Sequence, residues 1–333
     1  MKALASLAAG GPDTLVITDL PAPVAGPGQV VIGVKACAIN FPDALVIEDR
    51  YQFRPQRPFA PGGEVSGTVL AVGEGVSAFA PGDRVIALTV YGGLAEQVLA
   101  EASKTYPLPA DISWDDGAAL LMTYGTVIHA LKDRGRIKPG DTVLVLGAAG
   151  GIGIAAVELA HALGARVVAG VSDETKAIAA RESGADETVV YGRAPFDKAQ
   201  SKALAEAFKA ACGPDGAQIV VDPVGGDYSE PALRAIGWEG RFLVVGFPAG
   251  IAKVPLNLPL LKACDICGVF LGGFLDREPA HFAGHVAELI ELLRAGRFRP
   301  RIGAVLPLER GAEGIALLAG RKAIGKVVVR IGD

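Results

Sequence analysis

The sequence predicts an α/β protein that combines a doubly wound parallel sheet with a mostly antiparallel β-barrel. Two patterns indicate this fold. From residue 141 onward, apolar strands alternate with helical segments, as they do in an open parallel sheet. Before that, short β-like runs are separated by turns rich in Gly and Pro, which is typical of a barrel. With 333 residues and 50% hydrophobic content, the chain is long enough for two domains with large cores.

The barrel strands follow from turn signals in the first part of the chain. Residues 1–10 are interpreted as a first strand and not as a secretion signal, because Gly11-Pro12-Asp13 ends the apolar run too early. Turns are expected where Pro precedes Gly, at 27–28, 61–63 and 81–83. The strands expected between them are 29–36, 67–72, 84–88 and 95–100, and helical spacing then predicts a helix over 115–130.

The second part of the chain alternates between the two element types. Apolar runs predict strands over 142–146, 166–171, 188–191, 218–222, 241–246 and 266–270. Helical spacing between them predicts helices over 154–163, 175–183, 198–211 and 230–235. The chain then returns to the first domain through a helix at 280–295, a strand at 302–307, a helix at 310–319 and a strand at 326–331. The expected domain limits are therefore 1–123 and 271–333 for the barrel and 124–270 for the parallel sheet.

The run from Val143 to Ile154 carries the strongest functional signal. An apolar strand leads into a glycine-rich turn that opens into a helix, and a second buried strand completes a βαβ unit. Such a turn lets the backbone approach a pyrophosphate closely, while the N–H groups at the helix N-terminus face its negative charge. Gly150, Gly151 and Gly153 are expected to supply the turn, the close approach and the helix packing. The sequence thus predicts a dinucleotide site that also includes Ala149 and Ile152.

Composition excludes several other functions. The net charge of −4 provides no basic surface for nucleic acid. No stretch approaches the ~18 uninterrupted apolar residues that a membrane span needs. The four cysteines are mostly far apart, which suits reduced thiols in a cytoplasmic enzyme.

Several motifs at characteristic separations resemble one family. They are VSGTVLAVG at 65–73, PGDRV at 81–85, KPGD at 138–141 and GKVVV at 325–329. Together they resemble the medium-chain dehydrogenase/reductase superfamily, and within it the zinc-free NADPH:quinone oxidoreductase branch. The resemblance implies a GroES-like barrel as catalytic domain and a Rossmann-type domain for the cofactor. It also implies a homodimer joined edge to edge near residues 266–270, where an apolar edge strand needs covering.

The positions that hold zinc in metal-dependent members of that superfamily carry other residues here. Those members use a Cys shortly after the second strand and a His in a Gly-His-Glu turn, and the corresponding residues are Asn40 and Gly63. Neither residue can replace a thiolate or an imidazole in a tetrahedral zinc site. Segment 87–109 contains none of the four cysteines that a structural zinc needs. We therefore expect neither metal.

Other cysteines and histidines have ordinary interpretations that we favour. Cys264 and Cys267 are three residues apart on a predicted strand, so their side chains would point to opposite faces and form no redox or metal pair. His281 and His285 lie four apart on a predicted helix but have no evident third ligand, which favours a solvated helix face. His129 is expected to be a core residue with a hydrogen-bonding partner and not a proton shuttle.

The end of the second parallel strand predicts the cofactor. Rossmann strands that bind NADH usually end in an acid, which repels a 2′-phosphate. Here Ser172 ends the strand and Lys176 follows four residues later, and a hydroxyl and an ammonium both favour the phosphate of NADPH. Tyr191 resembles the family's tyrosine that packs against the same ribose and phosphate. Asp173 and Glu174 oppose this assignment, because an acid one residue further on would favour NADH.

The family pattern implies further cofactor contacts. Thr126 is expected beside the nicotinamide, Phe247 along its ribose, and Leu271, Gly272 and Gly273 over the carboxamide. Val224 and Gly246 complete the expected cofactor residues.

Without a metal to stabilise an oxyanion, conjugated acceptors such as quinones or α,β-unsaturated carbonyls fit best, because they delocalise the arriving charge. Tyr51 is the leading candidate for a proton donor, although it could equally form a wall of the substrate cleft. Asn40 could bind the nicotinamide ribose or the substrate oxygen, with Asp43 orienting its loop; a purely structural Asn in a tight turn is the alternative.

Two other activities remain open. Arg50, Arg54 and Arg57 surround Tyr51, which favours an enoyl thioester or enone reductase if they are more than solvated surface residues. A protein of another class, which binds NADPH with little turnover, is the second alternative.

Overall fold

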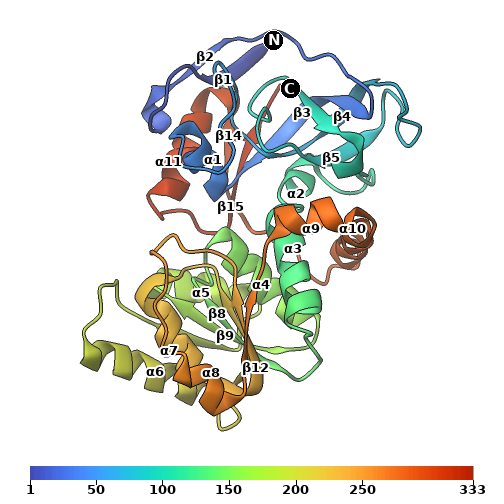
Figure 1. Cartoon of the computed structure of the whole chain (residues 1–333). Helices are drawn as coiled ribbons and strands as arrows, with labels where there is room; N and C mark the ends of the chain where they lie inside the picture. Colours follow the sequence, from blue (N-terminus) through green and yellow to red (C-terminus); the bar gives the residue numbers. More distant parts are fainter. Residues whose placement is uncertain (333) are drawn as a thin grey trace. The chain divides into compact units, whose positions relative to one another are not determined.

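The computed structural model describes residues 1–332 (Figure 1). Contacts within the chain divide it into two compact units. Unit 1 comprises Met1–Met122, Arg277–Arg294 and the chain from Pro300 onward, and unit 2 comprises Thr123–Asp276 and Ala295–Arg299. The sequence placed the second boundary after residue 270, whereas these contacts place it after Asp276.

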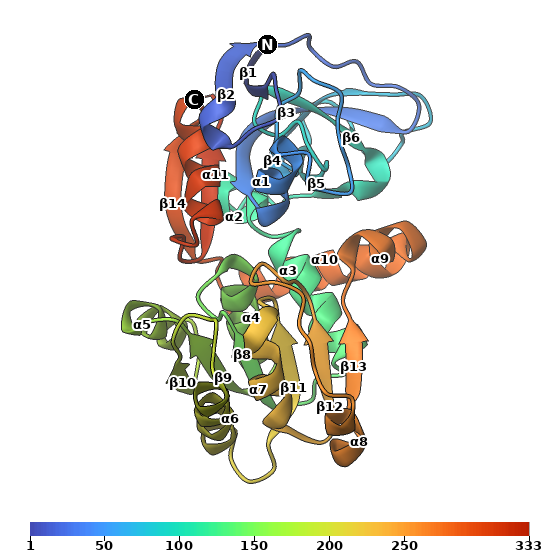
Figure 2. The same cartoon turned by 60° about the vertical axis from the view of Figure 1, so that its left-hand side comes forward.

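Unit 2 contains a six-stranded sheet in the order β10-β9-β8-β11-β12-β13, and every neighbouring pair is parallel (Figure 2). The order reverses between β8 and β11, as in a doubly wound Rossmann sheet. The predicted parallel sheet is therefore confirmed. Its strands are β8 (Thr142–Leu146), β9 (Arg166–Val171), β10 (Glu187–Val190), β11 (Ala217–Asp222), β12 (Ile236–Val244) and β13 (Asp265–Gly268).

Helices cover both faces of this sheet. Leu144 and Leu146 of β8 share a core cluster with Phe208 and Ala232, and the alternation of strand side chains directs Val143 and Val145 to the opposite face. The helices of unit 2 are α3 (Thr123–Ile128), α4 (Gly151–Ala162), α5 (Glu174–Glu182), α6 (Lys198–Cys212), α7 (Ser229–Arg234), α8 (Asn257–Lys262) and α9 (Leu271–Arg277). Within residues 1–332, no helix has the length and apolar character needed to cross a membrane.

Unit 1 is a mostly antiparallel β structure. One sheet runs β14-β15-β3-β4-β5-β7 with β6 also paired to β3, and β1 and β2 form a separate pair. Among the described residues of this unit, β14 and β15 are the only strands that run parallel to each other. The strands are β1 (Lys2–Ser6), β2 (Leu15–Asp19), β3 (Gln29–Ile39), β4 (Glu64–Val72), β5 (Arg84–Leu88), β6 (Gln97–Glu101), β7 (Thr105–Pro107), β14 (Ile302–Pro307) and β15 (Lys326–Arg330).

The last part of the chain completes the sheet of unit 1, as the sequence predicts. Strand β15 pairs with β3, so that Val327 lies opposite Ile39. This pairing brings the start of β15 to the end of β3, where Asn40 follows. The helices of unit 1 are α1 (Phe41–Ile47), α2 (Trp114–Ala118), α10 (Pro279–Arg294) and α11 (Gly311–Ala319).

The helix predicted over 115–130 is wrong as a single element. Helix α2 ends at Ala118, α3 begins at Thr123, and a π-helix (His129–Arg134) follows. Residues 118–121 are all buried. Every position in this segment is also apolar, so the sequence shows no 3.6-residue alternation that would mark where a helix begins or ends. The backbone N–H of Met122 donates to Glu64 Oε1 at 2.8 Å, which takes it out of the helical hydrogen-bond ladder.

Candidate active site

The expected cofactor residues of unit 2 follow the carboxyl ends of its parallel strands. Because these ends share one edge of the sheet, the residues line that edge, where open α/β sheets bind their ligands. They are Ala149, Gly150, Gly151 and Ile152 after β8, Ser172 and Lys176 after β9, Tyr191 after β10, Val224 after β11, Gly246 and Phe247 after β12, and Leu271, Gly272 and Gly273 after β13. Thr126 comes from α3 instead.

The glycine-rich turn fits a pyrophosphate. Gly147 has a φ of +57°, so this residue, and not Gly150, makes the turn. A Cβ on Gly153 would lie 2.1 Å from the carbonyl oxygen of Gly147, which explains the close packing of helix and strand. Gly150 is the N-cap of α4, and no side chain caps the helix there, whereas Asp173 and Asp197 cap α5 and α6. The first N–H groups of α4 are thus left to an anionic ligand.

A charged cluster follows β9 at the predicted phosphate position. Lys176 Nζ donates to Ser172 Oγ at 2.9 Å, and the Ser172 hydroxyl donates to Asp173 Oδ2 at 2.9 Å. Asp173 Oδ1 accepts the backbone N–H of Lys176 at 3.0 Å and so caps α5. That N–H, the Ser172 hydroxyl and the Lys176 ammonium hold the pKa of Asp173 below its ordinary value. The strand end therefore offers a cation and a hydroxyl, with a carboxylate beside them.

Tyr191 supports the glycine-rich turn through a hydrogen bond and ring contacts. Its buried hydroxyl accepts the N–H of Gly147 at 3.0 Å. Its ring contacts the rings of Phe208 and Tyr228 at centroid distances of 6.3 and 4.9 Å. Burial raises the pKa of this phenol well above its ordinary value, so it stays protonated. Tyr191 positions the turn, and its expected contact with the ribose stays a prediction.

The remaining cofactor residues have mixed environments. Ala149 and Thr126 are buried, while Phe247 is exposed. The N–H of Val224 donates to Asp222 Oδ1 at 2.9 Å, which fixes the loop after β11. Leu271, Gly272 and Gly273 form the first turn of α9 and not an open loop.

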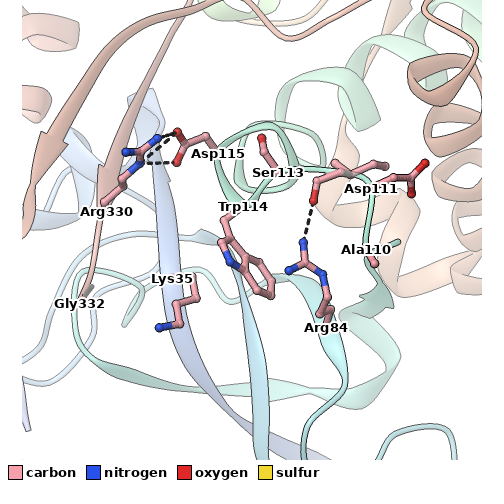
Figure 3. A pocket seen from close by; sticks show the side chains of 10 residues that line it. Lys35, Arg84, Ala110, Asp111, Ser113, Trp114, Asp115, Arg330 and Gly332 are labelled. Carbon is pink, nitrogen blue, oxygen red and sulfur yellow. Dashed lines mark hydrogen bonds and ion pairs between the residues drawn. The ribbon is translucent and has the colours of Figure 1, made fainter.

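Unit 1 has a surface hollow of about 490 Å³ at the Arg330 end of β15 (Figure 3). Arg84 stacks on Trp114, with the guanidinium carbon 3.5 Å from the ring centroid, and donates to the carbonyl of Ile112 at 2.6 Å. Arg330 pairs with Asp115 at 2.5 Å. These contacts tie β5 and β15 to the segment around α2, so Arg84, Arg330 and Asp115 have structural partners within the hollow.

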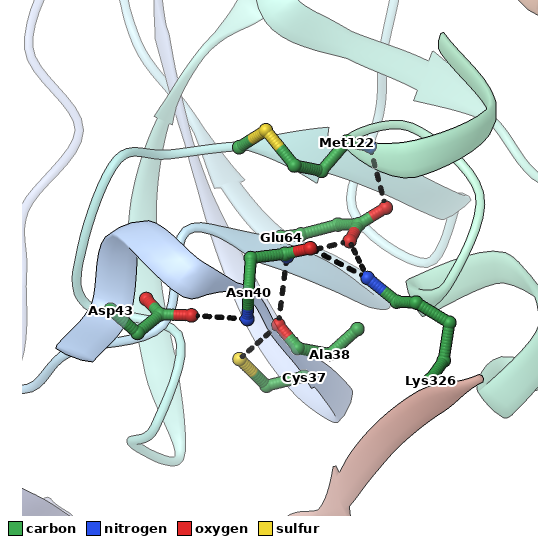
Figure 4. Close-up of polar contacts among 7 residues, drawn as sticks. All are labelled: Cys37, Ala38, Asn40, Asp43, Glu64, Met122 and Lys326. Carbon is green, nitrogen blue, oxygen red and sulfur yellow. Dashed lines mark hydrogen bonds and ion pairs between the residues drawn. The ribbon is translucent and has the colours of Figure 1, made fainter. Parts of the chain in front are cut away.

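A buried polar cluster lies at the opposite, Lys326 end of β15 (Figure 4). The Lys326 ammonium donates to Asn40 Oδ1 at 2.7 Å and to Glu64 Oε2 at 3.1 Å. Lys326 is 3% exposed and Glu64 is fully buried. The three residues meet because β3 pairs with both β4 and β15. Sequence reasoning missed Glu64 and Lys326, although each is a charged residue that opens an apolar strand.

The cluster fixes the amide of Asn40. Asn40 Nδ2 donates to Glu64 Oε2 at 2.9 Å and to the carbonyl of Ala38 at 3.3 Å, which uses both amide hydrogens. Its Oδ1 accepts from Lys326 and keeps a second lone pair. Asn40 can therefore accept one more hydrogen bond, as from a ribose hydroxyl, but has no hydrogen left for a substrate oxygen.

Asp43 holds the loop around Asn40. Its Oδ2 accepts the N–H of Asn40 at 2.6 Å, and its Oδ1 accepts the N–H of Gly62 at 3.0 Å. Burial raises the pKa of Asp43 to about 6, and the two N–H groups oppose that rise. Asp43 thus orients the backbone on both sides of the site.

These donors do not fit a zinc ion. Gly63 offers no side chain, and a Cβ at that position would lie 3.0 Å from the carbonyl oxygen of Val90. The amide of Asn40 is engaged by Lys326, Glu64 and Ala38. A tetrahedral zinc site needs nitrogen, thiolate or carboxylate donors that converge. Asn40 and Gly63 provide neither a thiolate nor an imidazole, and the carboxylate of Glu64 is engaged by Lys326, Asn40 and Met122.

Comparisons with known proteins agree with this architecture. Residues 151–291 match a family model described as a zinc-binding dehydrogenase, and residues 26–110 match an alcohol dehydrogenase GroES-like domain. Quinone oxidoreductase-like protein 2 of Bos taurus is 38% identical over 320 residues, which are 95% of this chain and 89% of that protein. The chain belongs to the quinone oxidoreductase family. These matches confirm the resemblance to the quinone oxidoreductase branch of the medium-chain dehydrogenase/reductase superfamily. They also confirm the predicted combination of a Rossmann-type sheet with a GroES-like domain.

Solved structures agree over the full length. A mycobacterial structure complexed with NADPH is 31% identical with a TM-score of 0.90, covering 99% of this chain and 100% of that one. The Escherichia coli quinone oxidoreductase complexed with NADPH is 26% identical with a TM-score of 0.88, covering 99% of this chain and 100% of that one. These likenesses place the chain in the quinone oxidoreductase family along both units.

In this family member, Tyr51 is a half-buried phenol on the core of unit 1. Burial raises the pKa of Tyr51, a hydrogen bond with the Gln52 side chain opposes the rise, and the charge of Asp43 adds to it. The phenol is therefore protonated at neutral pH. A proton donor must carry a proton, so the phenol is suited to that role. A protonated phenol is equally compatible with a residue that only lines the substrate cleft.

Two of the arginines around Tyr51 are held by the protein. Arg57 donates to Ser6 Oγ at 3.1 Å, to Asp49 at 3.1 Å and to the carbonyl of Ile47 at 2.9 Å. Arg50 pairs with Glu48 at 2.9 Å. Arg54 is exposed. Arg57 is thus a clamp within unit 1 and not a solvated residue.

The histidines and cysteines outside the site differ in part from expectation. Cys264 and Cys267 are buried free thiols, in agreement with core packing. His129 Nδ1 lies 2.7 Å from Asp133 Oδ2, so this buried ring has a partner as expected. His285 is buried, which makes the solvated helix face wrong for this residue; its ring centroid lies 4.7 Å from that of His281.

Removing the ammonium of Lys326 tests the buried cluster. In Lys326→Met, Glu64 becomes an uncompensated buried charge, and we expect a loss of about 3–5 kcal/mol in the free energy of unfolding. The double variant Lys326→Met/Glu64→Gln should recover much of that loss, because the remaining carboxamide is neutral. Denaturant unfolding measures both. A Lys326→Met protein as stable as wild type would contradict the role of the ion pair.

Proposed function

We propose that this protein transfers hydride from NADPH to a quinone. The proposal rests on the surroundings of Asn40. Its amide is fixed by a buried lysine and glutamate, and Gly63 leaves no ligand for a metal. An acceptor must therefore spread the charge that arrives with the hydride over its own conjugated system, as a quinone does.

NADPH supplies the hydride. The N–H groups of Gly151 and Ile152 at the start of α4 are suited to its pyrophosphate, and Ser172 and Lys176 to its 2′-phosphate. Asn40 is oriented to accept a ribose hydroxyl through its free lone pair. Support also comes from the two related structures that are complexed with NADPH.

The loops next to Asn40 and Gly63 favour a flat apolar acceptor. Phe41 follows Asn40, and Val90 touches the position of Gly63; both are partly exposed. Tyr91 is also exposed, with its ring edge-on to Phe59 at a centroid distance of 5.8 Å. The engagement of Arg50 and Arg57 in unit 1 disfavours a cationic entrance for coenzyme A thioesters.

An enone or enoyl thioester reductase is the second candidate, and the protonated phenol of Tyr51 supports it. A protein that binds NADPH with little turnover is the third. The three differ in which acceptors are reduced and in whether a proton donor is needed.

An NADPH-oxidation panel of quinones, enones, enals and enoyl thioesters separates them, run with wild type and Tyr51→Phe. We expect the highest kcat/KM with quinones, and at most a twofold change in Tyr51→Phe, because a delocalised product needs little acid catalysis. An enone reductase would instead lose about a hundredfold or more in the variant. Equal NADPH affinity of the two proteins is the control. Binding of NADPH without oxidation by any acceptor would leave only the third candidate.

We further propose a homodimer joined along β13. This strand ends the sheet of unit 2, and Ile266 and Phe270 are 42% and 60% exposed. An apolar edge of this kind needs a partner strand. Sedimentation should give the mass of a dimer for wild type and for Val24→Lys, which changes an exposed valine in unit 1, and of a monomer for Ile266→Lys. A monomeric wild type would contradict the proposal.

A further inference from the structure

We propose that Asp173 sets how strongly the protein prefers NADPH over NADH, by competing with the 2′-phosphate for Ser172 and Lys176. This inference rests on the proposed use of NADPH. The sequence alone presents Asp173 only as a residue that opposes the use of NADPH, whereas the structure shows that β9 ends at Val171 and that Ser172 and Asp173 both lie between β9 and α5.

The hydrogen bonds after β9 form a chain that runs from Lys176 through Ser172 to Asp173. Lys176 Nζ donates to Ser172 Oγ, and the single hydroxyl hydrogen of Ser172 goes to Asp173 Oδ2. Lys176 Nζ also lies 3.6 Å from Asp173 Oδ2. Both groups that suit a phosphate are thus already engaged with one carboxylate oxygen.

NADPH and NADH would interact differently with Ser172, Asp173 and Lys176. A 2′-phosphate must take the hydroxyl hydrogen of Ser172 away from Asp173 and must share the Lys176 ammonium with it, and it also faces the charge of that carboxylate. A 2′-hydroxyl can instead donate to the carboxylate, as it does to the acid of NADH-binding Rossmann strands. Asp173 therefore weakens the preference for NADPH and keeps NADH usable.

Capping of α5 does not account for both oxygens of Asp173. Oδ1 accepts the N–H of Lys176 and completes the cap, which leaves Oδ2 for Ser172 and Lys176. The side chain is 48% exposed, so a ligand can reach it. Asp173 lies two residues after the end of β9, beside Ser172, in the region where Rossmann domains select between cofactors.

Two substitutions separate charge from capping. Asn and Ser are both good N-cap residues, so Asp173→Asn and Asp173→Ser should keep α5 intact. Each removes the negative charge and releases the Ser172 hydroxyl hydrogen for a phosphate. Glu174→Gln is the matched control, since Glu174 lies one residue further on but pairs with Arg181 at 2.9 Å.

The test is equilibrium binding of NADPH and NADH, followed by the fluorescence of the reduced nicotinamide, and of 2′,5′-ADP and AMP by calorimetry. We expect the ratio of the NADH to the NADPH dissociation constant to rise about tenfold in Asp173→Asn and Asp173→Ser. Binding of 2′,5′-ADP should tighten, AMP should bind somewhat more weakly because its 2′-hydroxyl loses the carboxylate acceptor, and Glu174→Gln should resemble wild type. Thermal unfolding checks that each variant is folded.

Three outcomes would overturn the inference. An unchanged ratio in both Asp173 variants would remove Asp173 from cofactor selection, and the proposed function would stand. An equal shift in Glu174→Gln would assign the effect to overall charge. A wild-type protein that binds neither NADPH nor 2′,5′-ADP would overturn the inference together with the proposed function.

Discussion

The buried ion pair between Lys326 and Glu64 is the interaction on which the site in unit 1 depends. Both charges are removed from water, so each requires the other and the amide of Asn40. The pair joins the last strand of the chain to the start of β4. The second carboxylate oxygen accepts the N–H of Met122 and so helps end the helical segment before α3. One cluster thereby fixes strand pairing, a helix break and the orientation of a site residue.

This arrangement determines what chemistry the site can perform. A lysine ammonium already satisfies the side-chain oxygen of Asn40, and both amide hydrogens are in use. The asparagine side chain can therefore act only as a hydrogen-bond acceptor toward a ligand. In unit 2, no side chain at Gly150 caps the first N–H groups of α4. The hydroxyl of Tyr191 accepts the N–H of Gly147 and so holds the glycine-rich turn. The residues around Asn40 in unit 1 and around Gly147 in unit 2 are each held in place by hydrogen bonds within their own unit.

Local patterns were sufficient for much of the fold. The strands β5, β8, β9 and β14 have the predicted limits, because each is a short apolar run between clear turn signals. The helix over 115–130 failed because residues buried on all sides have no period, and because Glu64 draws the N–H of Met122 out of the helix. The turn glycine was misplaced for a related reason: only the backbone reveals the positive φ of Gly147.

The candidate site was predictable only in part. The strand-end residues follow from sequence, since parallel strands present them along one edge. The partnership of Glu64 and Lys326 does not, because they are 262 residues apart and meet only through the pairing of β3 with β4 and β15. The buried state of His285 likewise depends on packing that helical spacing does not reveal.

We propose that hydride reaches a conjugated acceptor without the help of a metal. The most direct test is the single-turnover oxidation of NADPH by a 1,4-quinone, with protein dialysed against a chelator and zinc measured on the same sample. We expect an undiminished rate in the chelated protein, and a slower rate when deuterium replaces the transferred hydrogen. Loss of the rate on chelation, with recovery on adding Zn²⁺, would contradict it.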